Sequence, residues 1–192
     1  MNYYKSVVWN NILTDNILSV IGSVEYSSSQ VVPLSKDKQV EIFNILKIDN
    51  TEYTTAKIML VYLPPNTRFS IHSDKPKETK DPRKSCRCLF LPLKSCDKLT
   101  WSWYEVTDST KVFYYGEANN WPIVPMISDS FALELDTVMC DKPFISDIGT
   151  FHSLRNDGNN SAIALSIRLM PWTCDNIDVD PILPPIHGVA LA

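Results

Sequence analysis

A histidine and an aspartate two residues apart, His72 and Asp74, end a stretch that reads as an extended strand. Side chains at positions i and i+2 of a strand point to the same side, so an imidazole and a carboxylate are predicted to face one point. Such a pair also arises by chance at surfaces and caps. A second histidine, His152, favours a metal site, because two histidines and one carboxylate form the facial triad that holds Fe(II) and leaves open coordination positions.

The chain has only three histidines, so any histidine chemistry must use some subset of His72, His152 and His187. His187 lies in a proline-rich tail, away from any alternating strand, and is read as a non-ligand. Asp147, five residues before His152, is a candidate brace for that imidazole, although a turn carboxylate is the commoner identity.

The residues after His152 predict an antiparallel hairpin. The turn sequence Asn-Asp-Gly-Asn-Asn at 156–160 separates segment 151–155 from segment 161–169, whose residues alternate strictly. If Arg155 pairs with Ser161, His152 lies opposite Ala164, where a small side chain leaves room for a metal.

The second arm of this hairpin has two different faces. One face, which is expected to pack, carries Ile163, Leu165 and Ile167; the other, which is expected to line a cavity, carries Ala162, Ala164, Ser166 and Arg168. An arginine grips a carboxylate through two parallel hydrogen bonds. Arg168 is therefore the candidate anchor for a small dicarboxylate whose other end chelates the metal, although a one-residue slip in register would turn it outward.

The surrounding pattern predicts a mainly β protein with one or two helices at its N-terminal flank. Helical spacing covers 11–21 and 36–48, with Ser35 as N-cap. The expected strands are 57–63, 68–72, 86–91, 99–105, 111–115, 131–138, 144–148, 151–155 and 161–169. About nine short strands at close spacing are typical of a sandwich or small barrel.

Length and composition indicate one globular domain over 1–192, with a helical flank to about 50, a β core at about 57–170 and a tail at 171–192. A net charge of −4 argues against nucleic acid and membrane surfaces as partners. The N-terminus lacks the pattern of a secretory signal, and no stretch reaches transmembrane length. Five cysteines, an odd number without a regular framework, favour a reducing compartment and a cytoplasmic location.

Three further features have two interpretations each. The basic segment 75–87 reads either as a lid that attracts acidic molecules or as a solvated loop. The aromatic set reads either as the floor of a substrate groove or as core packing; its members are Trp101, Trp103, Tyr104, Tyr114, Tyr115 and Trp121. The pair Cys86 and Cys88 could hold a soft metal, but half-buried strand thiols are the commoner case.

Taken in order, these segments resemble the Fe(II)/2-oxoglutarate-dependent oxygenase superfamily, in particular its compact branch near aspartyl/asparaginyl β-hydroxylases and prolyl hydroxylases. The resemblance runs over roughly 57–170, through Ile-His-Ser-Asp at 71–74, Arg-Cys-Leu-Phe-Leu-Pro-Leu at 87–93, His-Ser-Leu-Arg-Asn at 152–156 and Ala-Leu-Ser-Ile-Arg at 164–168. It implies a double-stranded β-helix (cupin-like jelly roll), with Fe(II) bound by His72, Asp74 and His152 and with 2-oxoglutarate as co-substrate.

The chain departs from this branch at one position. Many relatives carry the arginine for the distal carboxylate of 2-oxoglutarate where this chain has Ala162. Arg168 shares the face of Ala162 by parity and is the preferred substitute, Ser166 lies between them on that face, and Arg87 on a neighbouring strand is the second candidate.

The leading hypothesis is therefore a dioxygenase that hydroxylates a peptide, an amino-acid side chain or a small metabolite, using O₂ and converting 2-oxoglutarate to succinate. The alternatives are a cupin-like metal-binding or sensing protein without 2-oxoglutarate turnover, and a metal-free jelly roll with a structural or interaction role. The sequence leaves the prime substrate and the oligomeric state open.

Overall fold

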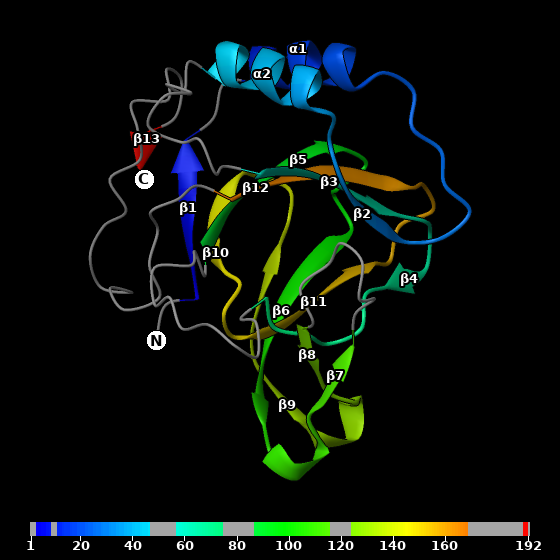
Figure 1. The fold of residues 1–192 in the computed structure, drawn as a ribbon, viewed down its shortest axis with the longest axis vertical. Coiled ribbons are helices and arrows are strands. Elements are labelled where there is room, and N and C mark those ends of the chain that lie inside the picture. Colours follow the sequence, from blue (N-terminus) through cyan, green and yellow to red (C-terminus); the bar gives the residue numbers. More distant parts are fainter. Residues whose placement is uncertain are drawn as a thin grey trace.

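The structure, a computed structural model, describes residues 3–8, 11–46, 57–74, 87–115, 124–168 and 190–191. It is mainly β, with two helices and antiparallel sheets (Figure 1). The helices are α1 (Asn11–Ile21) and α2 (Lys36–Leu46). The strands are β1 (Tyr4–Val8), β2 (Gln30–Pro33), β3 (Lys57–Leu63), β4 (Thr67–Arg68), β5 (Arg87–Lys94), β6 (Leu99–Val106), β7 (Phe113–Tyr115), β8 (Val124–Met126), β9 (Ala132–Met139), β10 (Phe144–Asp147), β11 (Phe151–Asn156), β12 (Ala162–Arg168) and β13 (Ala190–Leu191).

The strands form a large sheet, a small sheet and a hairpin. The large sheet has seven strands in the order β13-β1-β10-β5-β12-β3-β2, the small sheet has four in the order β4-β11-β6-β9, and β7 pairs with β8. From β3 to β6 and again from β9 to β12, successive strands lie in opposite sheets. This alternation between two facing antiparallel sheets is the topology of a jelly roll, so the predicted fold is confirmed.

Two buried clusters fill the spaces between the layers. The helix-side core joins α1 and α2 to one face of the large sheet, and it includes Ile17, Ile42, Leu89, Leu91, Ile163, Leu165 and Ile167. The inter-sheet core lies between the two sheets, and it includes Val61, Leu63, Cys88, Phe90, Leu99, Trp101, Trp103, Phe144, Leu154, Ala162 and Ala164. Because β12 belongs to both, its alternation of large and small residues matches two buried faces.

Local patterns predicted most of the helices and strands. The bounds of α1 and β3 agree with the prediction, and α2 begins at the predicted residue, where Ser35 Oγ accepts a weak hydrogen bond from the Lys38 N–H (3.5 Å). Segment 68–72 is strand only at its start, with an isolated bridge at His72. Strands β1, β2, β8 and β13 were not predicted, because runs of two to five residues are too short to show a period.

The predicted hairpin between 151–155 and 161–169 is wrong. Strand β11 pairs with β4 and β6, whereas β12 pairs with β3 and β5, so His152 lies opposite Trp103 and not Ala164. The connection between β11 and β12 crosses from the small sheet to the large one. It is held by Asn156, whose fully buried amide donates to the carbonyls of Leu63, Pro64 and Asn160 and accepts from the Gly158 N–H. The turn sequence therefore forms a corner between sheets.

No helix among the described residues combines the length and the apolar character needed to cross a membrane.

Candidate metal centre

His72 and His152 form a directly opposed antiparallel pair. The His72 N–H donates to the His152 carbonyl (3.0 Å), and the His152 N–H donates to the His72 carbonyl (2.7 Å). Cross-strand partners of this kind carry their side chains on the same face, and the two imidazole centroids lie 4.6 Å apart. Two histidines separated by 80 positions in the sequence thus lie together because their backbones pair.

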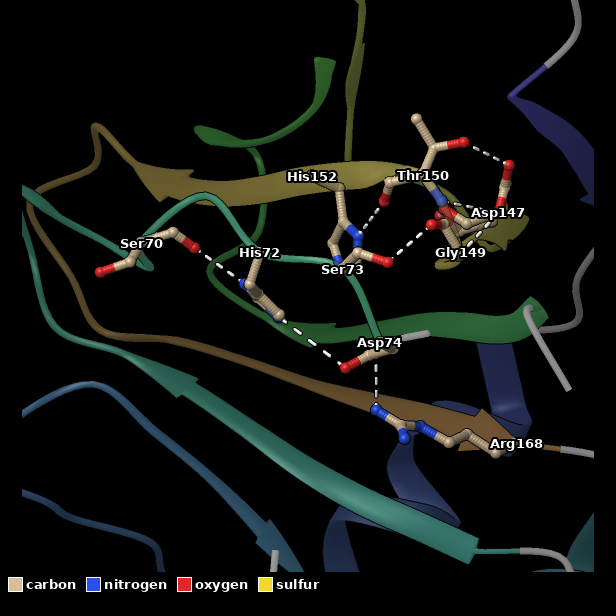
Figure 2. Close-up of polar contacts among 10 residues, drawn as sticks. Ser70, His72, Ser73, Asp74, Asp147, Gly149, Thr150, His152 and Arg168 are labelled. Atoms are coloured by element: carbon tan, nitrogen blue, oxygen red, sulfur yellow. Dashed lines mark hydrogen bonds and ion pairs between the residues drawn. The ribbon is translucent and has the colours of Figure 1, made fainter. Parts of the chain in front are cut away.

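Asp74 completes a cluster with the two histidines (Figure 2). Its N–H donates to the Ile148 carbonyl (2.8 Å), which fixes the backbone beside the loop before β11. Its Oδ1 lies 3.9 Å from His72 Nε2, and the ligand atoms of His72, Asp74 and His152 all lie within 4.8 Å of one another. The structure therefore brings together all three residues that the sequence singled out as metal ligands.

Hydrogen bonds orient both imidazoles in the same way (Figure 2). His72 Nδ1 lies 2.8 Å from the Ser70 carbonyl oxygen, and His152 Nδ1 lies 2.8 Å from the Thr150 carbonyl oxygen. Because a carbonyl oxygen only accepts, each Nδ1 must carry the proton. In the neutral imidazole this tautomer leaves the lone pair on Nε2, which is the arrangement found for histidines that bind metals through Nε2.

Asp147 organises the loop that holds His152. Its Oδ1 accepts from the N–H groups of Gly149 (2.7 Å) and Thr150 (3.3 Å), and its Oδ2 accepts from the Thr150 hydroxyl (2.8 Å). Since the Thr150 carbonyl faces His152 Nδ1, this turn carboxylate positions the imidazole through Thr150. Both interpretations of Asp147 therefore describe one arrangement.

Replacing Asp147 with alanine is expected to weaken metal binding about tenfold, because the Thr150 carbonyl loses its support, and changes in such outer partners cost about 10–100-fold in affinity. Calorimetric titration with Co(II) measures the effect. The control is Asp157→Ala, which removes an exposed carboxylate that pairs with Arg155. Equal affinities for the two variants would show that the Asp147 loop does not govern His152.

The electrostatics of the site favour the protonation states that metal ligands need. Burial, together with the nearby His72, lowers the pKa of His152 to about 3. For Asp74, burial acts to raise the pKa, but Arg168 and the two histidines outweigh it, so the pKa falls below its ordinary value. At neutral pH the site thus offers a neutral imidazole on His152 and an ionised carboxylate on Asp74.

Arg168 reaches this cluster from the large sheet. Its Nη2 donates to Asp74 Oδ2 (2.7 Å), so Asp74 has one oxygen turned to the guanidinium and the other towards His72 (Figure 2). Ser166, on the same face of β12, hydrogen bonds with the Cys88 side chain. Arg87 lies on β5 one residue before Cys88, so by alternation it shares the helix-side face with Leu89. The structure therefore brings Arg168, and not Arg87, to the face that carries the triad.

Trp101 is the neighbour whose closeness to the triad the sequence did not reveal. Its indole stacks on His152, with centroids 4.9 Å apart and planes 15° apart. Nearby Trp103 packs between rings of the inter-sheet core and donates from Nε1 to the Asp147 carbonyl (2.8 Å). The aromatic set had suggested either a groove or packing, and the side chains of Trp101 and Trp103 are buried in the inter-sheet core. Their shared side of β6 could be inferred by alternation, but the contact of Trp101 with His152 follows only from strand pairing.

The structure describes only some of the other residues that the sequence singled out. Cys88 is a fully buried free thiol, and burial raises its pKa to about 12. Tyr114 and Tyr115 are exposed on β7. The predictions on Cys86, Trp121, His187 and the basic segment 75–86 lie outside the described residues.

The donor set fits a divalent transition metal. Two imidazole nitrogens and one carboxylate oxygen suit Fe(II), and three protein ligands leave coordination positions for other molecules. The hydrogen bonds that orient the two imidazoles and the negative charge of Asp74 also favour a divalent metal ion at this site.

The sequence matches no protein-family model, and a search of curated proteins gives no match. Solved structures similar to this chain include a prolyl hydroxylase from Trichoplax adhaerens in complex with a hypoxia inducible factor oxygen degradation domain peptide fragment, with a TM-score of 0.45 and 11% identity over 89% of this chain and 84% of that chain. HygX from Streptomyces hygroscopicus, with nickel and 2-oxoglutarate bound, gives a TM-score of 0.45 and 10% identity over 88% of this chain and 84% of that chain.

An oxalate decarboxylase from Lactobacillus farciminis gives a TM-score of 0.37 and 11% identity over 78% of this chain. This chain spans 31% of the length of that decarboxylase chain. At these TM-scores and identities the fold of the chain rests on its own strand order, and its chemistry has to be inferred from its own residues.

Proposed function

We propose that this chain is a non-haem Fe(II)- and 2-oxoglutarate-dependent oxygenase that hydroxylates a peptide, an amino-acid side chain or a small metabolite. The observation that carries the proposal is the cluster of His72, Asp74 and His152, whose ligand atoms lie within 4.8 Å of one another. The free Nε2 lone pairs support it, because both imidazoles are held in the tautomer that binds metal.

When bound, Fe(II) and 2-oxoglutarate supply the oxidation of the substrate by O₂, coupled to decarboxylation of 2-oxoglutarate to succinate. The chain's own residues prepare the site. His72 and His152 present nitrogen lone pairs, Asp74 supplies a negative charge, and the carbonyls of Ser70 and Thr150 fix the rings. The apolar inter-sheet core packs around Trp101 and keeps water from the far side of His152.

Arg168 is the proposed anchor for the distal carboxylate of 2-oxoglutarate, with Ser166 beside it. One nitrogen of the guanidinium donates to Asp74, while Nε is buried and has no partner among the described residues. Arginine carries five N–H donors, so the pair with Asp74 leaves donors for a second carboxylate.

The proposed setting is a single cytoplasmic domain that does not act on nucleic acid or membranes. The three cysteines in the described part of the chain, Cys88, Cys96 and Cys140, are buried free thiols, which suits a reducing compartment.

An anaerobic titration tests the proposed function. Fe(II) is added to the protein, followed by 2-oxoglutarate, and the visible charge-transfer band of the chelated co-substrate is recorded. We expect stoichiometric Fe(II) binding and then the band. Failure to bind Fe(II) would overturn the proposal, while Fe(II) binding without the band would favour the alternative of a metal-binding protein without 2-oxoglutarate turnover.

Replacing Arg168 with alanine is expected to weaken 2-oxoglutarate binding about 100-fold, since it removes a charged donor from a buried carboxylate. The charge-transfer band, followed as 2-oxoglutarate is titrated, measures the effect. Arg87→Ala is the matched variant, because Arg87 lies on the helix-side face of β5 and its loss should leave the affinity unchanged. The reverse pattern would make Arg87 the anchor.

A further inference from the structure

Two buried side-chain nitrogens lack a hydrogen-bond partner among the residues that the structure describes, Trp101 Nε1 and Arg168 Nε. Both side chains touch the candidate metal ligands: Trp101 stacks on His152, and Arg168 pairs with Asp74. Buried polar groups are nearly always paired, and their exceptions gather where a ligand or water is missing. Unpaired donors on two sides of one triad therefore point to a ligand bound there.

Trp101 is the more informative of the two, because its indole has only one polar atom. The side chain is 2% exposed, and its ring neighbours besides His152 are Phe90, Trp103 and Phe144. The side chains of these three residues carry no hydrogen-bond acceptor other than a ring face, and the indole N–H has no backbone partner among the described residues either. The indole stacks on the imidazole of a metal ligand, so among the described surroundings a molecule bound at the metal beside His152 is the candidate acceptor for Nε1.

Trp103 shows what the same residue does when its partner is present. It stands two positions along β6 on the same face, is also fully buried, and donates from Nε1 to the Asp147 carbonyl at 2.8 Å. Of these two neighbouring indoles, one has its N–H paired and the other does not. The contrast indicates that what Trp101 lacks is a hydrogen-bond acceptor for Nε1.

We propose that Trp101 Nε1 donates a hydrogen bond to a carboxylate oxygen of the 2-oxo acid bound at the metal, which makes Trp101 a co-substrate-binding residue. This rests on the proposed function, because it takes a 2-oxo acid as the ligand. A carboxylate is an acceptor only, and it binds N–H donors more strongly than a neutral acceptor does. The role depends on the N–H and not on the ring.

Replacing Trp101 with 3-benzothienylalanine, which keeps the shape of the indole and removes the N–H, tests the role directly. Trp101→Phe serves as a second variant that also keeps an aromatic ring against His152. In the anaerobic titration we expect Fe(II) affinity within about twofold of the wild type and 2-oxoglutarate affinity weaker by roughly tenfold or more, as for one lost hydrogen bond to a charged group.

A measurement on the unsubstituted protein removes any dependence on how the variants fold. The chain has five tryptophans, and each gives one indole N–H signal in a ¹H–¹⁵N spectrum. With redox-inert Zn(II) in the site, added 2-oxoglutarate should shift the Trp101 indole proton downfield and slow its exchange with water. The Trp103 signal should stay in place, because its proton is already bound to Asp147.

The outcomes separate this inference from the proposed function. Wild-type protein that binds no Fe(II) or 2-oxoglutarate would overturn both. Wild-type protein that binds 2-oxoglutarate, with unchanged affinity in the benzothienyl variant and an unmoved Trp101 signal, would overturn only the role of Trp101. Weaker 2-oxoglutarate binding together with the downfield shift would establish it.

Discussion

Replacement of Asp74 with alanine should weaken metal binding by more than about 100-fold. Loss of an outer partner of a metal ligand already costs about 10–100-fold, so loss of the anionic ligand itself must cost more. The substitution also leaves the Arg168 guanidinium beside two imidazoles without its counter-charge, which opposes cation binding further. Calorimetric titration with Co(II), or anaerobically with Fe(II), measures the dissociation constant.

The control is Asp129→Ala. Asp129 pairs with Arg68 at the surface, where its side chain is 60% exposed, so its removal should change metal affinity by less than about twofold. Tight binding that survives in the Asp74 variant, or that is lost equally in both, would show that the metal binds elsewhere on the chain.

Replacement of Asn156 with alanine should lower the free energy of unfolding by about 3 kcal/mol, since a typical hydrogen bond contributes about 1 kcal/mol and buried carbonyls left unpaired cost more. The Asn156 amide is fully buried and makes four hydrogen bonds, three from Nδ2 and one to Oδ1. They join the end of β3 to the corner between β11 and β12. Urea unfolding, followed by tryptophan fluorescence, measures the change.

Asn159→Ala, in the same corner, is the matched control. Asn159 is exposed, so its removal should change the free energy of unfolding by less than about 0.5 kcal/mol. An Asn156 variant as stable as the Asn159 variant would contradict the view that this side chain fastens the crossing between the sheets.

Short-range patterns in the sequence predicted the features that depend on neighbouring residues. The alternation of β12 separated Ile163 and Leu165 from Ala164, and the structure places them in two different cores. The H-x-D spacing indicated that His72 and Asp74 face the same point, and their side chains lie 3.9 Å apart. Periodicity indicates which face of a strand is apolar, because alternate residues along a strand point to opposite faces.

The choice of strand partners was decided by the tertiary structure. The sequence alone suggested that β11 and β12 pair, because they are adjacent and joined by a turn sequence; yet each pairs within a different sheet. A strand that is buried on both faces must lie between two layers, and only the packing of the helices and the small sheet shows that β12 does so.

The candidate metal site likewise combines features that local sequence predicts with contacts that only the tertiary structure determines. His72, Asp74 and His152 could be selected from the sequence as candidate metal ligands, because few residue types bind Fe(II) and the chain has only three histidines. Their closeness follows from a backbone pair between positions 72 and 152, and the contacts of Arg168 with Asp74 and of Trp101 with His152 follow from two sheets that face each other. Contacts between residues that are far apart in the sequence depend on which surfaces are buried against each other. The local spacing of residues does not indicate these contacts.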